Sequence, residues 1–289
     1  MPFRILAATD GSSSAHAAIV TALEFPWPHP SRARAVVALG RIGPPIGPSL
    51  RAAVVRSLYQ ETEPARRLLA RRWPDADAVA LHDAPADAIL AEARRFRADA
   101  IALGWRGHGA VRRLLAGSVS RAIVARAAQP VLVVRTAAEK VRRLVIGFDG
   151  SPGARRALRF LAKLEPRRGG SAIVVAVSES IWLPGVTRRL PSAMLASLRS
   201  EAVQLNRKRA RLARMEADAA ASRLRRAGWA AKAEVREGAA LEALLAASTD
   251  LHGDVLVVGA RAGGVSRTPI GSVSSGALNH SRIPVLIVP

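Results

Sequence analysis

The stretch RILAATDGSSSAHAAIVTAL, residues 4–23, decides the fold, because the chain repeats its pattern as RLVIGFDGSPGARRALRFL at residues 143–161. Each stretch has an apolar run, then Asp-Gly-Ser, then an alanine-rich segment with helical periodicity. A second pair also matches: GSVSRAIVARAAQPVLVV at residues 117–134 and GSVSSGALNHSRIPVLIV at residues 271–288. The sequence therefore predicts two copies of one structural unit.

Strand and helix patterns alternate within the first copy. The expected strands are residues 3–9, 34–39, 78–82, 99–103 and 130–135, and the expected helices are residues 12–24, 50–72, 85–97 and 118–127. Such alternation implies right-handed crossovers and a parallel sheet. Runs such as AIALG and VLVV are continuously apolar, which is typical of strands buried on both faces. We predict an α/β fold of two tandem, open, doubly wound parallel five-stranded sheets with helices on both faces.

The predicted domains are residues 1–137 and 141–289, joined by a short link. The second copy is longer, and the extra length falls in SESIWLPGVTRRLPSAMLASLRSEAVQLN, after the strand AIVVAV. A long helix is expected there, over about residues 192–227. Arginines fill one side of it, and its other side carries the apolar residues of an amphipathic helix: Leu198, Leu205, Leu212, Met215 and Ala219.

The composition limits the class of protein. Hydrophobic residues make up 49% of the 289 residues but aromatic residues only 4%, so the core must be aliphatic. The absence of cysteine excludes disulfides, thiolate metal sites and cysteine nucleophiles. The N-terminus lacks the apolar run of a signal peptide, and no stretch approaches the roughly 18 apolar residues of a membrane span. We expect a cytoplasmic protein with no membrane partner.

The net charge of +22 comes almost entirely from arginine, since only four of the 44 basic residues are lysine. A charge of this size can attract nucleic acid or acidic lipid. The arginines are, however, spread along the chain, and many alternate with alanine. The most basic stretch, residues 207–226, lacks aromatic residues for base stacking and matches no standard binding module. Binding to nucleic acid remains an alternative that the pattern does not favour.

A glycine-rich loop, GWRGHGAVRRLLAGSVS, follows the fourth predicted strand at residues 104–120. In doubly wound sheets, ligands bind beyond the carboxyl ends of the strands, where the strand order reverses. If the first and fourth strands are neighbours, Asp10 and Gly104 open onto one crevice. The helix that begins near Ser118 would then direct its N–H groups and its positive dipole end at a phosphate. The alternatives are a solvated turn and, for Asp10, a simple capping role beside Ser12.

At these residues the sequence resembles the universal stress protein family in its tandem two-domain form. The resemblance covers nearly the whole chain and rests on the repeated Asp-Gly-Ser, on the terminal PVLVV strands, and on the loop Gly-x2-Gly-x9-Gly-Ser, which the first copy matches in full. The resemblance implies the fold of the adenine nucleotide alpha hydrolases. It also implies a crevice for ATP, AMP or another adenine nucleotide, with Mg²⁺ bound through the phosphates rather than by side chains.

Carried over residue by residue, the resemblance implies a nucleotide site in the first copy. The first strand would line the adenine and ribose, the second strand would pack on adenine, and the loop with its helix would contact ribose and phosphates. In chain order these positions are Ala8, Thr9, Asp10, Leu39, Gly104, Gly107, Gly117, Ser118, Val119 and Ser120.

The second copy departs from this pattern, since it reads GARAGGVSRTPIGSVS. Its loop is one residue shorter, Ala262 stands where the middle glycine should be, and Pro269 stiffens the end. We therefore expect a weaker site in the second copy. Its matching positions are Asp149, Val177, Gly259, Gly271 and Ser272.

These patterns favour a stress-response regulatory protein that binds an adenine nucleotide. No P-loop lysine motif and no nucleophile elbow is present, so any enzyme activity would be slow ATP hydrolysis or self-phosphorylation, at Ser118 or Ser120. No histidine pair has the spacing of metal ligands. Each copy ends in an apolar strand whose edge needs a cover. We expect the two last strands to pair about a pseudo-two-fold axis, and a homodimer is a further alternative.

Overall fold

The computed structural model describes residues 1–39, 47–107, 116–179, 192–261 and 270–289. The first copy contains β1 (Phe3–Thr9), α1 (Ser13–Glu24), β2 (Ser31–Leu39), α2 (Pro48–Ala70), β3 (Asp77–His82), α3 (Pro85–Arg95), β4 (Ala100–Gly104), α4 (Ser118–Arg126) and β5 (Val131–Val134). The second copy contains β6 (Arg143–Gly147), α5 (Pro152–Leu161), β7 (Ser171–Ser178), α6 (Ser192–Arg226), β8 (Ala230–Glu237), α7 (Ala240–Asp250), β9 (Val255–Gly259), α8 (Ser272–His280) and β10 (Val285–Val288).

The predicted order of strands and helices in the first copy is confirmed, with small shifts at the ends. The largest shift is in β2, which begins at Ser31 rather than at residue 34. Ser31, Arg32 and Ala33 pair with the first residues of β1. Their backbone hydrogen bonds make them part of the strand although their side chains are mostly small or charged.

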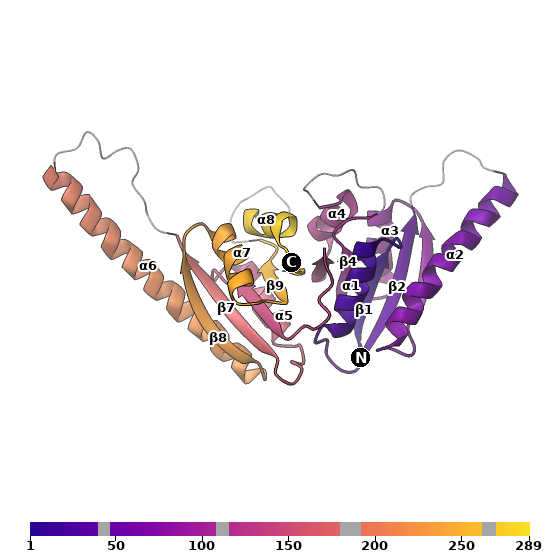
Figure 1. The fold of residues 1–289 in the computed structure, drawn as a ribbon, viewed down its shortest axis with the longest axis horizontal. Helices are drawn as coiled ribbons and strands as arrows, with labels where there is room; N and C mark the ends of the chain where they lie inside the picture. Colours follow the sequence, from indigo (N-terminus) through magenta and orange to yellow (C-terminus); the bar gives the residue numbers. More distant parts are fainter. Residues whose placement is uncertain (40–46, 108–115, 180–191, 262–269) are drawn as a thin grey trace.

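The strands form one sheet in the order β3-β2-β1-β4-β5-β10-β9-β6-β7-β8 (Figure 1). All pairings within each copy are parallel, so the predicted fold class is confirmed for both halves. The two halves meet where β5 and β10 pair antiparallel, with Leu132 opposite Leu286. Within the first half, β1 lies directly beside β4, and Ala8 is opposite Leu103. This is the adjacency that a crevice between Asp10 and Gly104 requires.

The core forms two layers, one on each face of the sheet. One layer packs under α1, α2, α5 and α6 and continues across both copies. The other packs under α3, α4, α7 and α8 and is also shared. Most of the buried side chains are Ala, Val, Leu and Ile, as the composition indicated, although Phe25 and Trp27 are fully buried beside α1.

The inward face of α6 differs from the predicted one. The helix packs on β7 and β8 through small residues at its C-terminal end, and the apolar stripe expected from the sequence is largely exposed: Leu205 is 42%, Leu212 51% and Met215 67% exposed. The residues that face the sheet are Ala217, Ala220, Ala221 and Leu224. Alanine lets a helix approach a sheet closely, so the smaller side chains occupy the interface and the larger ones do not.

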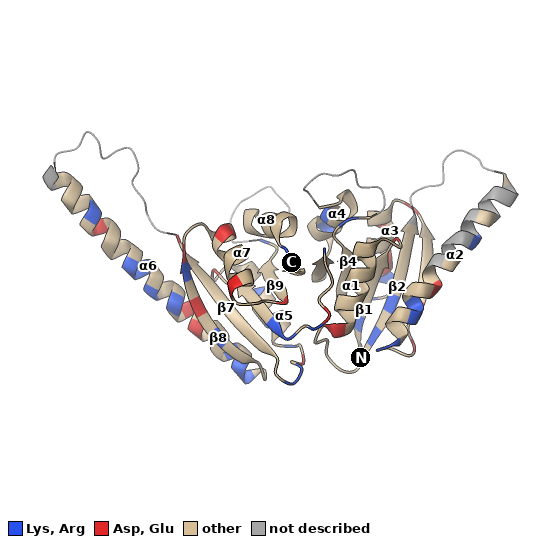
Figure 2. Cartoon of the chain, in the orientation of Figure 1, with Lys and Arg blue, Asp and Glu red and all other residues tan. Residues whose placement is uncertain are grey.

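The outer part of α6 extends beyond the sheet and contains several basic residues (Figures 1 and 2). Basic residues also occur in the lower part of α2 and near the lower ends of the strands, so they are spread over several elements of both copies (Figure 2). Within the described residues, no helix combines the length and the apolar character needed to cross a membrane.

Candidate functional site

The two Asp-Gly-Ser turns have the same geometry. Gly11 and Gly150 have φ values of 80° and 70°, which only glycine adopts readily, so the chain can turn sharply after each first strand. In the first copy Asp10 Oδ1 accepts a hydrogen bond from Ser12 N at 3.1 Å, and Ser12 Oγ accepts one from Ala15 N at 3.2 Å. The capping role considered for this turn is therefore present. It also holds the Asp10 carboxylate at the carboxyl end of β1.

Glycines at the ends of β4 and β9 allow a helix to lie against the strand end. A Cβ on Gly104 would stand 2.7 Å from Ala15 N, and a Cβ on Gly259 would stand 2.8 Å from Ala154 N. Both distances are too short for a real contact with backbone atoms. Glycine is thus needed at these two positions because α1 packs against the end of β4 and α5 against the end of β9. This reason is separate from the close approach of ribose or phosphate that the resemblance implies.

The helices that follow the glycine loops begin without a side-chain cap. The N-cap residues of α4 and α8 are Gly117 and Gly271, and neither has a capping hydrogen bond from a side chain. By contrast, Ser12 and Ser151 cap α1 and α5. The first N–H groups of α4 and α8 therefore have no side-chain acceptor at the cap, which is the arrangement that suits an anion.

The serines in the first turns of α4 and α8 are of two kinds, one buried and one exposed. Ser120 is only 3% exposed, and its hydroxyl donates to the carbonyl oxygen of Gly104 at 2.8 Å. Ser274 is equally buried and donates to the carbonyl oxygen of Gly259 at 2.6 Å. Ser120 therefore joins the helix to the strand end, whereas Ser118 is exposed. Of the two serines considered for self-phosphorylation, only Ser118 is accessible.

The predicted residues of the first copy gather around a small cavity of about 120 Å³. Gly107 lies so close to the carboxylate of Asp10 that a Cβ at residue 107 would overlap Oδ2. The cavity is narrow on this side because the loop end and the carboxylate meet. Gly117 and Ser118 do not line it, but the other predicted positions with described side chains do: Ala8, Thr9, Asp10, Gly104, Gly107, Val119 and Ser120.

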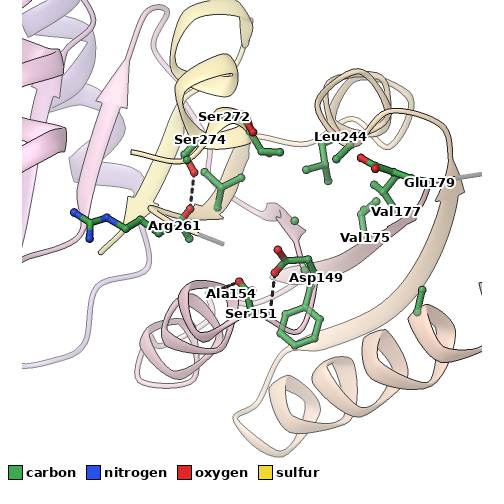
Figure 3. Close-up of a pocket in the computed structure, with 18 of the residues that line it drawn as sticks. Asp149, Ser151, Ala154, Val175, Val177, Glu179, Leu244, Arg261, Ser272 and Ser274 are labelled. Atoms are coloured by element: carbon green, nitrogen blue, oxygen red, sulfur yellow. Dashed lines mark hydrogen bonds between the residues drawn. The ribbon is translucent and has the colours of Figure 1, made fainter. Parts of the chain in front are cut away.

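The second copy has a much larger cavity, of about 560 Å³, at the equivalent place (Figure 3). Its size falls within the range of roughly 300–1,000 Å³ found for ligand pockets. Asp149 and Ser272 lie on opposite sides, and Val175, Val177 and Leu244 contribute apolar surface (Figure 3). All five positions predicted for this copy line the cavity: Asp149, Val177, Gly259, Gly271 and Ser272.

Several lining residues were missed by the sequence analysis. Arg209 from α6 and Glu179 after β7 both line the second cavity, although neither belongs to a recognisable motif. Ala38 lines the first cavity one position before the predicted Leu39, whose side chain lies outside the described residues. Val36 pairs with Ala8 and Val175 with Gly147, so Ala38 is the counterpart of Val177. The strand register identifies this equivalence, and the sequence could have shown it only by aligning the copies from their Asp-Gly-Ser turns.

The cavity volume and the glycine-loop pattern favour different copies as the place of a ligand site. The complete glycine spacing lies in the first copy, but the larger cavity lies in the second. Ala262 and Pro269, on which the expected weakness of the second site depends, lie outside the described residues.

Comparison with known proteins supports one family for both copies. Residues 1–135 and 140–289 each match the model of the universal stress protein family. A universal stress protein from Thermus aquaticus is 38% identical over 133 residues, which cover 45% of this chain and 97% of that protein. One from Mycobacterium tuberculosis is 28% identical over 196 residues, which cover 66% of this chain and 61% of that protein. A solved universal stress protein from Archaeoglobus fulgidus shares the fold over 99% of this chain and 97% of its own, with a TM-score of 0.68 and 18% identity.

Proposed function

The chain belongs to the universal stress protein family, and on that premise we propose that it is a stress-response regulator that holds ATP or a related adenine nucleotide. The site would be the crevice at the carboxyl ends of β1 and β4. Occupancy by the nucleotide would change the surface around the loop and so the partners that the protein binds.

The observation that carries this proposal is the meeting of three features at one edge of the sheet. The Asp10 carboxylate lies at the end of β1, Gly107 lies against it, and α4 begins nearby at Gly117 without a side-chain cap. A carboxylate suits a ribose hydroxyl, and uncapped N–H groups suit a phosphate. For a nucleotide to enter, Gly107 and Asp10 must separate, because the cavity of about 120 Å³ is smaller than a typical ligand pocket.

A magnesium ion would take most of its ligands from the nucleotide. Among the described residues, no group of three or more histidine or acidic side chains could hold a metal ion. Mg²⁺ usually keeps several waters and binds through one or two carboxylates and the phosphates of a substrate. The ion would supply positive charge beside the phosphates.

The direct test is to identify and count the nucleotide released when the purified protein is denatured. Calorimetric titration with ATP of wild type, Asp10→Ala and Asp149→Ala then locates the site. We expect one tight site per chain, lost in Asp10→Ala and kept in Asp149→Ala, with a second site that is weak or empty. Equal losses from the two substitutions, with two sites in the wild type, would disprove the difference between the copies. No binding of ATP, ADP or AMP would disprove the proposed function.

The pairing of β5 with β10 suggests how the copies assemble in solution. Both strands are fully buried, and each would leave an apolar edge if its partner were removed. We expect residues 1–137, expressed alone, to form a dimer in which two β5 strands replace the β5–β10 pair. Light scattering would measure the mass, and a soluble monomer at micromolar concentration would contradict the prediction.

A further inference from the structure

Trp105 lies at the junction of the two copies, directly after β4. Its side chain is 7% exposed, and its indole N–H donates to the carbonyl oxygen of Leu278 at 2.7 Å. Leu278 belongs to the last turn of α8, where carbonyl groups have no partner within the helix. The guanidinium carbons of Arg106 and Arg135 lie 4.1 Å and 3.6 Å from the centre of the indole ring. Cation–π contacts of this kind favour one orientation of the ring.

A second contact joins the other end of the glycine loop to the same helix. The backbone N–H of Ala116 donates to Asn279 Oδ1 at 3.2 Å. Ala116 is buried and immediately precedes Gly117, the N-cap residue of α4. Gly117 N in turn donates to the carbonyl oxygen of Trp105 at 2.9 Å. The start and the end of the loop are thus held together and are both tied to α8 of the second copy.

The contact runs in one direction only. Ala260 is the counterpart of Trp105, because each donates its backbone N–H to the last strand of its own copy, at 2.6 Å and 2.7 Å respectively. Alanine has no side-chain donor. The counterpart of Asn279 in the first copy is Ala125, which has no side-chain acceptor. The second copy therefore supports the loop of the first through Leu278 and Asn279, and the equivalent pairs of residues, Ala260 and Ala125 among them, cannot make the same two side-chain contacts.

The first end of the loop also contacts the proposed nucleotide crevice. The carbonyl oxygen of Arg106 accepts hydrogen bonds from the hydroxyls of Ser14 and, at 3.3 Å, Ser12, so the residue after Trp105 rests on the first turn of α1. Gly107 then meets Asp10. A change in the position of Trp105 would move Arg106 and Gly107 relative to Asp10, and a change at Ala116 would move the start of α4.

We propose that Trp105 and Asn279 are positioning residues for nucleotide binding, so that the site of the first copy is complete only when the second copy is attached. The proposal rests on the proposed function of the first crevice. Its physical basis is preorganisation: a loop whose ends are already fixed loses less conformational freedom when a phosphate binds, and its affinity is higher for that reason.

The test compares variants that carry Asp149→Ala, so that only the first site is titrated with ATP. Asn279→Ala removes the acceptor, whereas Asn279→Asp keeps a carboxyl oxygen in its place. Trp105→Phe keeps an aromatic ring against the two guanidinium groups but removes the N–H. We expect Asn279→Ala and Trp105→Phe to weaken ATP binding by about threefold to tenfold each, the loss expected for one hydrogen bond. Asn279→Asp should restore the affinity to within about twofold of the parent.

His280→Ala is the matched control, because His280 is an exposed neighbour in the same turn of α8 and should leave ATP binding unchanged. Hydrogen exchange of the Ala116 amide, measured without nucleotide, reports the contact itself. It should become faster in Asn279→Ala and return to the parent rate in Asn279→Asp.

Three results would overturn the proposal. One is faster exchange at Ala116 with unchanged ATP affinity, which would make the contact structural only and leave the proposed function standing. Another is an equal loss of affinity in Asn279→Asp. The third is no binding of adenine nucleotide by the wild type, which would remove the proposed function and this inference together.

Discussion

A valine at residue 107 is expected to abolish ATP binding by the first copy while the protein stays folded. A Cβ at this position would overlap Oδ2 of Asp10, which is the end of a side chain that can rotate away. The fold therefore tolerates the change, but the carboxylate and the loop end lose their relative position. A displacement of ~1 Å weakens several charge-assisted hydrogen bonds to phosphate together, and each ~1.4 kcal/mol lost lowers the affinity about tenfold. We expect a loss of at least about a hundredfold in calorimetric titration.

Two companion variants make this result specific. Gly117→Val should have a similar effect on binding, because the branched side chain would stand at the uncapped start of α4. Gly47→Ala is the control, since Gly47, the N-cap residue of α2, does not line the first cavity and a Cβ there has no neighbour within 4 Å. Unchanged affinity in both valine variants, with circular dichroism showing a native fold, would mean that the loop does not hold the phosphates.

An alanine at residue 259 is expected to destabilise the second copy strongly. The added Cβ would stand 2.8 Å from Ala154 N and still closer to the carbonyl carbon of Gly153, both of which are backbone atoms of α5. Backbone atoms cannot rotate away, so α5 must move relative to β9. Overpacking of a core in this way costs about 1–3 kcal/mol of unfolding free energy, and the involvement of backbone places the cost near the upper limit.

Urea denaturation measures this effect, and Gly104→Ala provides the equivalent change in the first copy, where the Cβ would meet Ser14 and Ala15. Gly259→Ala strains the second copy and Gly104→Ala the first, although the two copies share both core layers. Fluorescence and circular dichroism should be recorded together, because coincident transitions show that the two copies unfold as one unit. The same Gly47→Ala control should shift the midpoint only slightly. A stability of Gly259→Ala equal to that of wild type would show that α5 can move without cost.

The sequence was sufficient to predict the order of elements and a set of residues that gather around one cavity in each copy. The repeat, with Asp-Gly-Ser after one strand and Gly-Ser before the last helix, identified both copies and the strand ends around which the predicted residues lie. Apolar runs such as that of β4 predicted strands buried on both faces, and Ala100–Leu103 are buried as expected. The order of elements and the burial of the strands could be predicted because short stretches of sequence determine them.

Features that depend on contacts between distant segments were not predictable. Trp105 reads as one residue of a solvated loop, and only the pairing of β5 with β10 brings Leu278 within reach of its indole. In α6, periodicity identified a side with large apolar residues, but the side that packs against the sheet is the one with alanines, because small side chains allow the helix to approach closely. The small volume of the first cavity depends on how Gly107 meets Asp10, which a spacing of glycines does not specify.

The unequal anchoring of α6 gives one continuous helix two different local stabilities. Its C-terminal turns share the cooperative unfolding of the sheet, because Ala217, Ala221 and Leu224 are buried against it. Its N-terminal turns expose Met194 and Leu205 and depend mainly on intrinsic helix propensity, which is marginal for segments of this length in water. We expect this end to unwind and re-form while the sheet remains intact, so that its amides exchange with solvent faster than those of the C-terminal turns.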